Sequence, residues 1–146
     1  MGKSTSWETG LLNLVFDNLA YANVGNAGGL QPSSAAGNFF VALHTADPGV
    51  SGDQTTNETS YTGYARVAVV RSSSGWTISG NSVSNTAAIN FGLCTAGTPT
   101  ITHFSIGTAV SGADTMLYSG ALTNSLAVSN GITPSFAIGA LSVSES

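Results

Sequence analysis

From residue 39 to the C-terminus, short apolar segments alternate with clusters of Gly, Ser and Asn at a spacing of about ten residues. Segments of this length, bounded by turn residues, are typical of antiparallel β-strands. The predicted strands are residues 39–45, 64–71, 76–78, 81–83, 87–91, 101–106, 116–119, 125–128 and 134–143. Such a series favours an all-β sandwich or barrel.

One segment at the N-terminus has helical periodicity instead. Its apolar residues are Trp7, Leu11, Leu12, Val15, Phe16 and Leu19, and most of them recur at a spacing of three or four. Thr5 followed by Glu8 fits a capping box, in which side chains bond the free N–H groups at a helix start. We predict an amphipathic helix that ends near residues 22–23. Its apolar stripe is interpreted as a core face, with docking on a neighbouring subunit as the alternative.

The length of 146 residues fits a single domain. Within it we predict an N-terminal helical region (1–23), a linker rich in Gly, Ser and Asn (24–37) and a β-sandwich (38–146). The tripeptide Asp47-Pro48-Gly49 predicts a turn, because Pro fixes φ and Gly tolerates a positive φ. A polar loop follows this turn and extends to about residue 62.

Charged residues make up only 7% of the chain, with three basic and seven acidic residues and a net charge of −4. Because phosphate binding requires clustered Lys and Arg, we expect no nucleic-acid partner. A basic membrane-binding face and a membrane-spanning segment are not expected either. No secretory leader is evident. The single cysteine, Cys94, permits no internal disulfide and is predicted to be a buried, inert thiol.

The sequence offers little material for catalysis or metal binding. His44 and His103 lie in predicted strands with apolar neighbours, so we interpret both as structural histidines. Asp47, Asp53 and Glu58 share one loop but lack the spacing of a calcium-binding EF-hand, and a solvated loop is the favoured interpretation. We therefore predict no catalytic residue, no metal site and no cofactor.

Two further groups of residues have alternative interpretations. Aromatic planes can stack on sugars, and the candidates for a sugar-binding face are Trp76, Tyr61, Tyr64 and Tyr118. The alternative, which we favour, is that these rings fill the core. Arg66 is expected to pair with an acidic residue of the preceding loop.

Five segments carry a resemblance to a known family. They are FVALHTADPG (40–49), GYARVAV (63–69), ITHFSI (101–106), MLYSGALT (116–123) and TPSFAIGAL (133–141). In this order they resemble small virion proteins of tailed bacteriophages, which are described as tail-fibre-like or as capsid decoration (cement) proteins. The resemblance implies a β-sandwich or jelly-roll-like component of the virion that is made in the host cytoplasm and has no enzymatic activity.

The scarcity of charge agrees with a protein that functions in an assembly, because the cores of stable interfaces are depleted in charged residues. We predict a decoration protein on the capsid exterior that binds the major capsid protein and itself, as a dimer or trimer. The predicted contact residues are Trp7, Leu11, Leu12, Phe16, Asp47, Asp53 and Tyr61. The alternatives are a tail-fibre or receptor-binding module that recognises host glycans and, less favoured for lack of ionisable residues, a small enzyme such as a cell-wall hydrolase.

Overall fold

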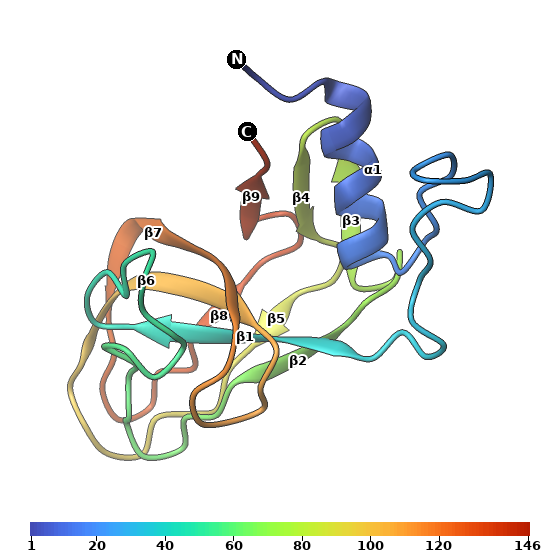
Figure 1. The fold of residues 1–146 in the computed structure, drawn as a ribbon. Helices are drawn as coiled ribbons and strands as arrows, with labels where there is room; N and C mark the ends of the chain where they lie inside the picture. Colours follow the sequence, from blue (N-terminus) through green and yellow to red (C-terminus); the bar gives the residue numbers. More distant parts are fainter. The chain divides into compact units, whose positions relative to one another are not determined.

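The computed structural model describes residues 1–146 and contains one helix followed by nine strands (Figure 1). The elements are α1 (Thr5–Phe16), β1 (Asn38–His44), β2 (Val67–Val70), β3 (Trp76–Ser79), β4 (Ser82–Asn85), β5 (Ile89–Asn90), β6 (Thr100–Gly107), β7 (Met116–Ala127), β8 (Ser135–Phe136) and β9 (Ser142–Ser144). The strands form three antiparallel sheets. The predicted mainly-β class with a single N-terminal helix is therefore confirmed.

The chain forms two compact units. Unit 1 consists of residues 1–38, 70–88 and 136–146, and unit 2 consists of residues 39–69 and 89–135. Unit 1 therefore joins the N-terminal helix to strands from the middle and the end of the chain. Unit 2 contains most of the largest sheet and the long loops that leave it.

Helix α1 is shorter than predicted at its C-terminal end. Ser4 is the N-cap, and its hydroxyl accepts a hydrogen bond of 3.3 Å from the Trp7 N–H. The capping role predicted for Thr5 is thus wrong, because Thr5 already belongs to the helix. The helix ends at Phe16, and Asn18 then adopts a φ of 54°. A left-handed residue cannot continue an α-helix, so the predicted extension to residues 22–23 does not form.

The helix packs against the sheet of unit 1, which has the strand order β3-β4-β9. The Phe16 ring contacts the Trp76 ring edge-on, with centroids 5.0 Å apart. Leu12, Phe16 and Trp76 are fully buried. Val83 of β4 and Leu141 are almost fully buried. The interpretation of the helix stripe as a core face is correct for Leu12 and Phe16.

Arg71 connects the end of α1 to the segment that follows it. Its guanidinium donates hydrogen bonds to the Leu14 carbonyl (2.9 Å), the Val15 carbonyl (2.6 Å) and the Ala36 carbonyl (3.0 Å). The carbonyls at a helix C-terminus lack partners within the helix and favour a positive charge. Arg71 therefore both caps α1 and anchors the Gly/Ser/Asn-rich segment.

The predicted strand 134–143 is divided into two short strands, and this prediction was wrong. The Asn85 side chain accepts a hydrogen bond from the Leu141 N–H (2.9 Å) and donates one to the Ala137 carbonyl (2.9 Å). Gly139 between them has a φ of 73°. These bonds stabilise a turn between β8 and β9, because the buried amide of Asn85 replaces the backbone partners that a strand would supply.

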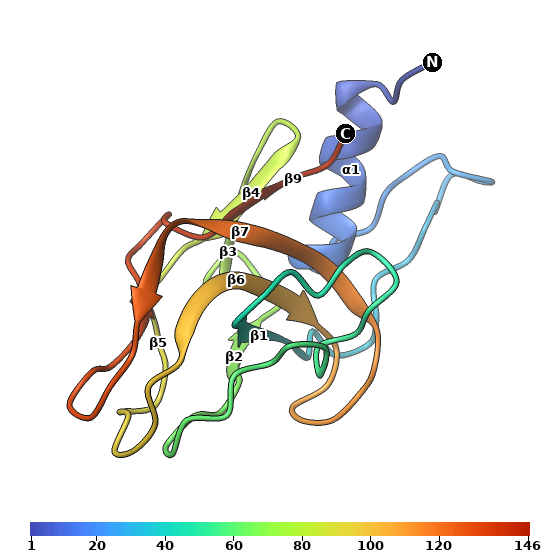
Figure 2. The same cartoon turned by 90° about the vertical axis from the view of Figure 1, so that its left-hand side faces the viewer.

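The sheet of unit 2 has the strand order β2-β1-β6-β7 (Figure 2). In its centre Leu43 pairs with Phe104 and Val41 with Ile106, and all four side chains are buried. The predicted strands 116–119 and 125–128 are replaced by the single strand β7 over most of their length. Its pairing with β6 has two register shifts, which let one long strand follow a curved neighbour.

Candidate functional site

A buried polar network connects the centre of the unit 2 sheet to its loops, and it starts at His44. This side chain is fully buried. Its Nδ1 lies 2.9 Å from the Thr56 carbonyl and its Nε2 lies 2.7 Å from Ser105 Oγ. Because a carbonyl only accepts, Nδ1 carries the proton and Nε2 accepts from the serine. Burial lowers the pKa of His44, so the imidazole is neutral. The predicted structural role is correct.

Gln54 continues the network from the loop that covers this face of the sheet. Its amide nitrogen donates to Ser105 Oγ (3.1 Å) and to the Phe40 carbonyl (2.9 Å). The side chain is 1% exposed and lies against Gly107, where an added Cβ would be 2.3 Å from the Gln54 Oε1. A glycine at 107 therefore provides the space that Gln54 needs.

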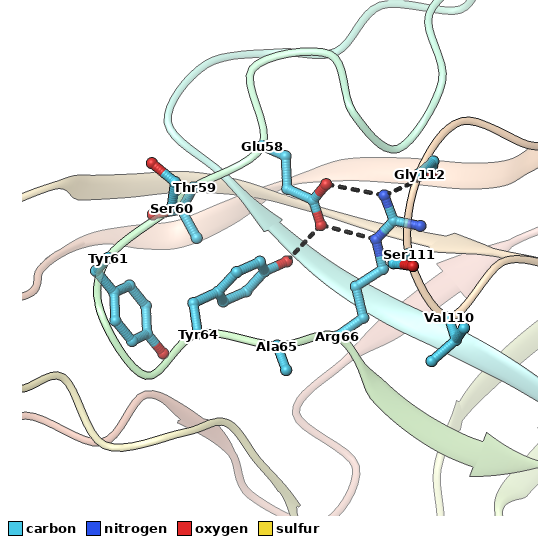
Figure 3. Close-up of a pocket in the computed structure, with 10 residues that line it drawn as sticks. All are labelled: Glu58, Thr59, Ser60, Tyr61, Tyr64, Ala65, Arg66, Val110, Ser111 and Gly112. Atoms are coloured by element: carbon cyan, nitrogen blue, oxygen red, sulfur yellow. Dashed lines mark hydrogen bonds and ion pairs between the residues drawn. The ribbon is translucent and has the colours of Figure 1, made fainter.

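Arg66 is the centre of the network, as Figure 3 shows for its contacts with Glu58 and Gly112. Its Nε and Nη2 bind the two Glu58 carboxylate oxygens at 2.7 and 2.8 Å. Nη1 donates to Gln54 Oε1 (3.3 Å) and to the Ala109 carbonyl (2.9 Å), and Nη2 also donates to the Gly112 carbonyl (2.9 Å). All the N–H donors of the guanidinium are thus engaged within the chain. The predicted pairing of Arg66 with a loop carboxylate is confirmed.

Tyr64 connects this ion pair to the sheet. Its hydroxyl donates to Glu58 Oε1 (2.8 Å) and accepts from the Leu43 N–H (3.1 Å). Burial raises the pKa of Tyr64 far above its usual value, and the hydrogen bond from the Leu43 N–H opposes this shift. Hydrogen bonding to Glu58 raises the pKa of the Arg66 guanidinium. Both groups therefore keep their protons at physiological pH.

A pocket of about 410 Å³ lies over this ion pair, bounded by residues 58–61, 64–66 and 110–112 (Figure 3). A second pocket of about 300 Å³ lies beside Thr45 and residues 97–99 and shares residues 58–61 with the first. Glu58, Tyr64 and Arg66 at the wall of the first pocket are held in the network, and Ser60 is exposed. The arrangement suits contact with a neutral surface better than acid–base chemistry.

Three loops of unit 2 meet at one end of the sheet, and we call residues 61–64, 92–99 and 129–134 the three-loop end. Their tips lie side by side in both views (Figures 1 and 2). Backbone hydrogen bonds join them, from Thr62 to Ala96 (2.9 Å) and from Cys94 to Ile132 (2.8 Å). A Cβ added at Gly63 would lie 2.1 Å from the Leu93 carbonyl oxygen. The loops are thus fixed by close backbone approach.

The three-loop end contains no charged residue. Two aliphatic side chains are exposed on it, Leu93 (50%) and Ile132 (37%). Small hydroxyl and amide residues surround them. Cys94 lies beneath, fully buried, with its thiol 3.4 Å from the Ala96 carbonyl. The prediction of a buried thiol is confirmed.

The seven residues predicted to contact partners differ widely in exposure. Leu12 and Phe16 are fully buried and Tyr61 is 5% exposed, with its hydroxyl donating to the Gly92 carbonyl (2.8 Å). Trp7, Leu11 and Asp53 are half-buried, and Asp47 is exposed. Contact of these residues with another protein stays a prediction, for which Trp7, Leu11, Asp47 and Asp53 have accessible surface.

Asp47 and Asp53 organise the loop that carries them. Asp47 accepts a hydrogen bond from the Gly49 N–H (2.9 Å), which closes the predicted turn. Asp53 accepts from both the hydroxyl and the N–H of Thr55, and these bonds lower the pKa of Asp53. The described chain contains no cluster of three or more potential metal ligands.

The aromatic residues proposed for a sugar-binding face are dispersed. Trp76 is fully buried in unit 1 beside Phe16. Tyr61 and Tyr64 contact each other edge-on in unit 2, at 5.5 Å between centroids. The favoured interpretation of core rings is correct for Trp76 and Tyr61.

Comparison with known protein families places this chain in a family. The family described as Podophage GP4 fiber I protein gp80 matches residues 2–144. The chain belongs to this family. The match confirms the resemblance to virion proteins of tailed phages and identifies a structural virion protein of the fibre type. No curated protein matches the chain significantly. None of its helices has the length and apolar character required to span a membrane.

The sequence does not reveal two residues on which the site depends, Gln54 and Tyr64. Gln54 is one polar residue among many in a loop, and its burial depends on a glycine more than fifty positions away. The sequence identifies Tyr64 only as an aromatic ring, whereas its hydroxyl is what contributes to the network. Partners elsewhere in the chain determine both roles.

Proposed function

We propose that this chain is a non-enzymatic structural subunit of a phage fibre and that the three-loop end is a contact surface for a neighbouring virion protein. The observation that carries the proposal is the three-loop end itself, which has no charged residue and exposes Leu93 and Ile132. Its loops are joined by backbone hydrogen bonds from Thr62 to Ala96 and from Cys94 to Ile132, so the surface is ordered and neutral. Rigid loops lose little conformational entropy when they bind.

The composition of the three-loop end supports a protein partner. Neutral hydroxyl, amide and aliphatic groups cost less to remove from water than charged groups do. Interface cores are depleted in Lys, Glu and Asp, and the aliphatic side chains of Leu93 and Ile132 are accessible on this surface. Recognition of host glycans, the alternative drawn from the sequence, has less support because Trp76 and Tyr61 are buried.

Capsid decoration is the second candidate function, with the major capsid protein as the partner. The low charge of the whole chain favours it, because a decoration protein covers its neutral surfaces against a lattice. Half-buried Trp7 and Leu11 on α1 would then be further contacts. Fibre and capsid roles both require incorporation into the virion, and they differ in where the chain lies.

Incorporation tests the contact surface. We expect Leu93→Asp/Ile132→Asp to reduce the copies per virion by about tenfold or more, because a buried carboxylate without a partner is costly. The matched control is Val50→Asp, at an exposed aliphatic residue outside the three-loop end. The measurement is quantitative mass spectrometry of purified virions, with circular dichroism to verify folding. Normal incorporation of the folded double variant would refute the contact.

A further inference from the structure

The buried network of unit 2 holds a hydroxyl, a base and a carboxamide in mutual contact. The hydroxyl is that of Ser105 on β6, the base is His44 on β1, and the carboxamide is that of Gln54 in the loop after β1. Ser105 and His44 are fully buried, and Gln54 is 1% exposed. A nucleophile within hydrogen-bond reach of a base, with the base held by a third group, is the arrangement that nucleophilic attack requires.

The pairing of β1 with β6 brings the hydroxyl to the base. Ser105 lies opposite Ala42, and His44 is two residues further along β1. Alternate residues of a strand share a face, so His44 and Ser105 are diagonal neighbours on one face of the sheet. Ser105 Oγ lies 2.7 Å from His44 Nε2, and the Thr56 carbonyl keeps the imidazole proton on Nδ1. The unprotonated Nε2 is therefore directed at the serine, as in a Ser–His pair.

Gln54 places an acyl group beside the same hydroxyl. Its Nε2 lies 3.1 Å from Ser105 Oγ and 2.9 Å from the Phe40 carbonyl, and its Oε1 lies 3.3 Å from Arg66 Nη1. A carbonyl only accepts and a guanidinium only donates, so these partners determine which amide atom is the oxygen. Attack at the amide carbon places negative charge on Oε1, where the cationic N–H of Arg66 stabilises it.

The surroundings of the amide favour a reaction within the chain. A Cβ added at Gly107 would lie 2.4 Å from Gln54 Cδ, so the glycine allows the close approach of the amide to β6. Groups held in contact by the fold react at a high effective concentration, and a site closed to water protects the product from hydrolysis. The amide must turn its face toward Ser105 Oγ, and the terminal torsion of a glutamine is soft enough to allow this.

We propose that Ser105 and Gln54 form an ester cross-link within the chain, with His44 as the general base. Ser105 Oγ attacks Gln54 Cδ while its proton passes to His44 Nε2. The Cδ–Nε2 bond then breaks, the imidazolium returns the proton to the leaving nitrogen, and ammonia departs. The Oγ–Cδ ester bond remains, and the reaction consumes no oxidant, reductant or other reactant.

The cross-link ties the loop after β1 to the sheet. It joins residues 51 positions apart in a chain whose single cysteine permits no internal disulfide. A covalent closure of this kind stabilises a fold mainly by restricting the unfolded chain. Each chain reacts once and only with itself, so the cross-link is compatible with a non-enzymatic structural subunit and goes beyond that proposed function.

Tryptic digestion of the denatured wild-type chain tests the cross-link. Trypsin cleaves after the three basic residues, which are Lys3, Arg66 and Arg71. Cleavage separates Gln54, in fragment 4–66, from Ser105, in fragment 72–146. We expect the two fragments to remain one species, with a mass lower than their sum by one ammonia molecule, and mild alkali to separate them by hydrolysing the ester. Two separate fragments would overturn the proposal, even if one has lost ammonia by forming a succinimide at an asparagine.

Three variants assign the roles of the side chains, with circular dichroism to verify folding. Ser105→Ala removes the nucleophile, so we expect separate fragments. His44→Gln removes the base and should slow the appearance of the linked species about 100-fold or more. The matched control Ser129→Ala removes an exposed hydroxyl of unit 2 and should be linked as in the wild type.

Two results for the variants would contradict the proposal. Linked fragments in Ser105→Ala would show that another residue is the nucleophile, and linkage at the wild-type rate in His44→Gln would exclude His44 as the base. The wild-type digest decides whether the cross-link exists, even if a variant does not fold. None of these outcomes bears on incorporation through Leu93 and Ile132.

Discussion

At the scale of single residues, the position of Arg66 decides how the site can be used. An arginine over a pocket often binds an anion, but here its donors bind Glu58, Gln54 and two loop carbonyls. The same side chain is 2% exposed. A guanidinium with every donor engaged stabilises the loops instead of recognising a ligand.

Substitution of Arg66 tests this role. We expect Arg66→Met to lower the free energy of unfolding by about 3 kcal/mol, because the half-buried Glu58 loses its cationic partner and Gln54 Oε1 and the Ala109 and Gly112 carbonyls lose their donors. The matched control is Lys3→Met, which removes the more exposed ion pair with Glu145 and should cost about 1 kcal/mol or less. Urea denaturation followed by circular dichroism measures both. Equal losses would contradict a structural role for Arg66.

His44 gives the fold a dependence on pH. Its pKa in the folded chain lies below the unfolded value of 6.5. The unfolded state therefore binds the proton more readily, and stability is lost as pH falls below about 6.5. We expect urea midpoints between about pH 6.5 and pH 5 to decrease more steeply in the wild type than in His44→Gln, which does not titrate in this range. If the urea midpoints of the wild type and His44→Gln changed in parallel with pH, His44 would be excluded as the source of the pH dependence.

At the scale of secondary-structure elements, helix α1 has two faces with different roles. Leu12 and Phe16 are fully buried in unit 1, whereas Trp7 and Leu11 are half-buried. Trp7 still contacts the Tyr21 ring, with centroids 5.4 Å apart. The face with Leu12 and Phe16 thus stabilises unit 1, whereas Trp7 and Leu11 on the other face remain partly accessible.

Alanine variants separate these two faces. We expect Phe16→Ala to lower the free energy of unfolding by about 3–5 kcal/mol, because it leaves a cavity beside Trp76. Leu11→Ala should cost markedly less, because its side chain is only partly buried. Chemical denaturation monitored by tryptophan fluorescence gives both values. A larger loss for Leu11→Ala would contradict the assignment of the two faces.

The three-loop end depends on glycine at one close contact. Gly63 has a φ of 103° and almost touches the Leu93 carbonyl, whereas Gly131 has a φ of 94° and open space around it. Both Gly→Ala variants carry the cost of a left-handed alanine, about 1–2 kcal/mol. We expect Gly63→Ala to lower the free energy of unfolding by at least about 1 kcal/mol more than Gly131→Ala, because the backbone at Leu93 must move away from the new Cβ. Thermal unfolding of the pair measures the difference, and equal losses would show that the contact is not tight.

The sequence predicted most elements but fewer of their boundaries. Periodicity located α1, β1, β6 and the β3–β4 hairpin, because local alternation determines these elements. It did not reveal the early end of α1 at Asn18 or the turn that Asn85 stabilises, because both depend on side chains acting at a distance. At the site, the sequence analysis predicted that Arg66 pairs with an acidic residue of the preceding loop, and this residue is Glu58. The roles of Gln54 and Tyr64 required the fold.

At the scale of the whole chain, the low charge has a structural explanation. Unit 2 uses the Glu58 carboxylate and the Arg66 guanidinium to hold loops, and both the three-loop end and strand β7 contain no charged residue. Neutral, ordered surfaces of this kind suit a protein that functions within an assembly. Membership of a fibre-type virion family agrees with this description.

Imaging of the intact virion at a resolution that resolves side chains is the most direct test of the central claim. The account predicts that this chain lies in a fibre, with Leu93 and Ile132 buried against a neighbouring virion protein and the Arg66–Glu58 pair intact. Density for the chain only at icosahedral positions on the capsid would establish decoration instead. A chain in a fibre with an exposed three-loop end would contradict the proposed contact.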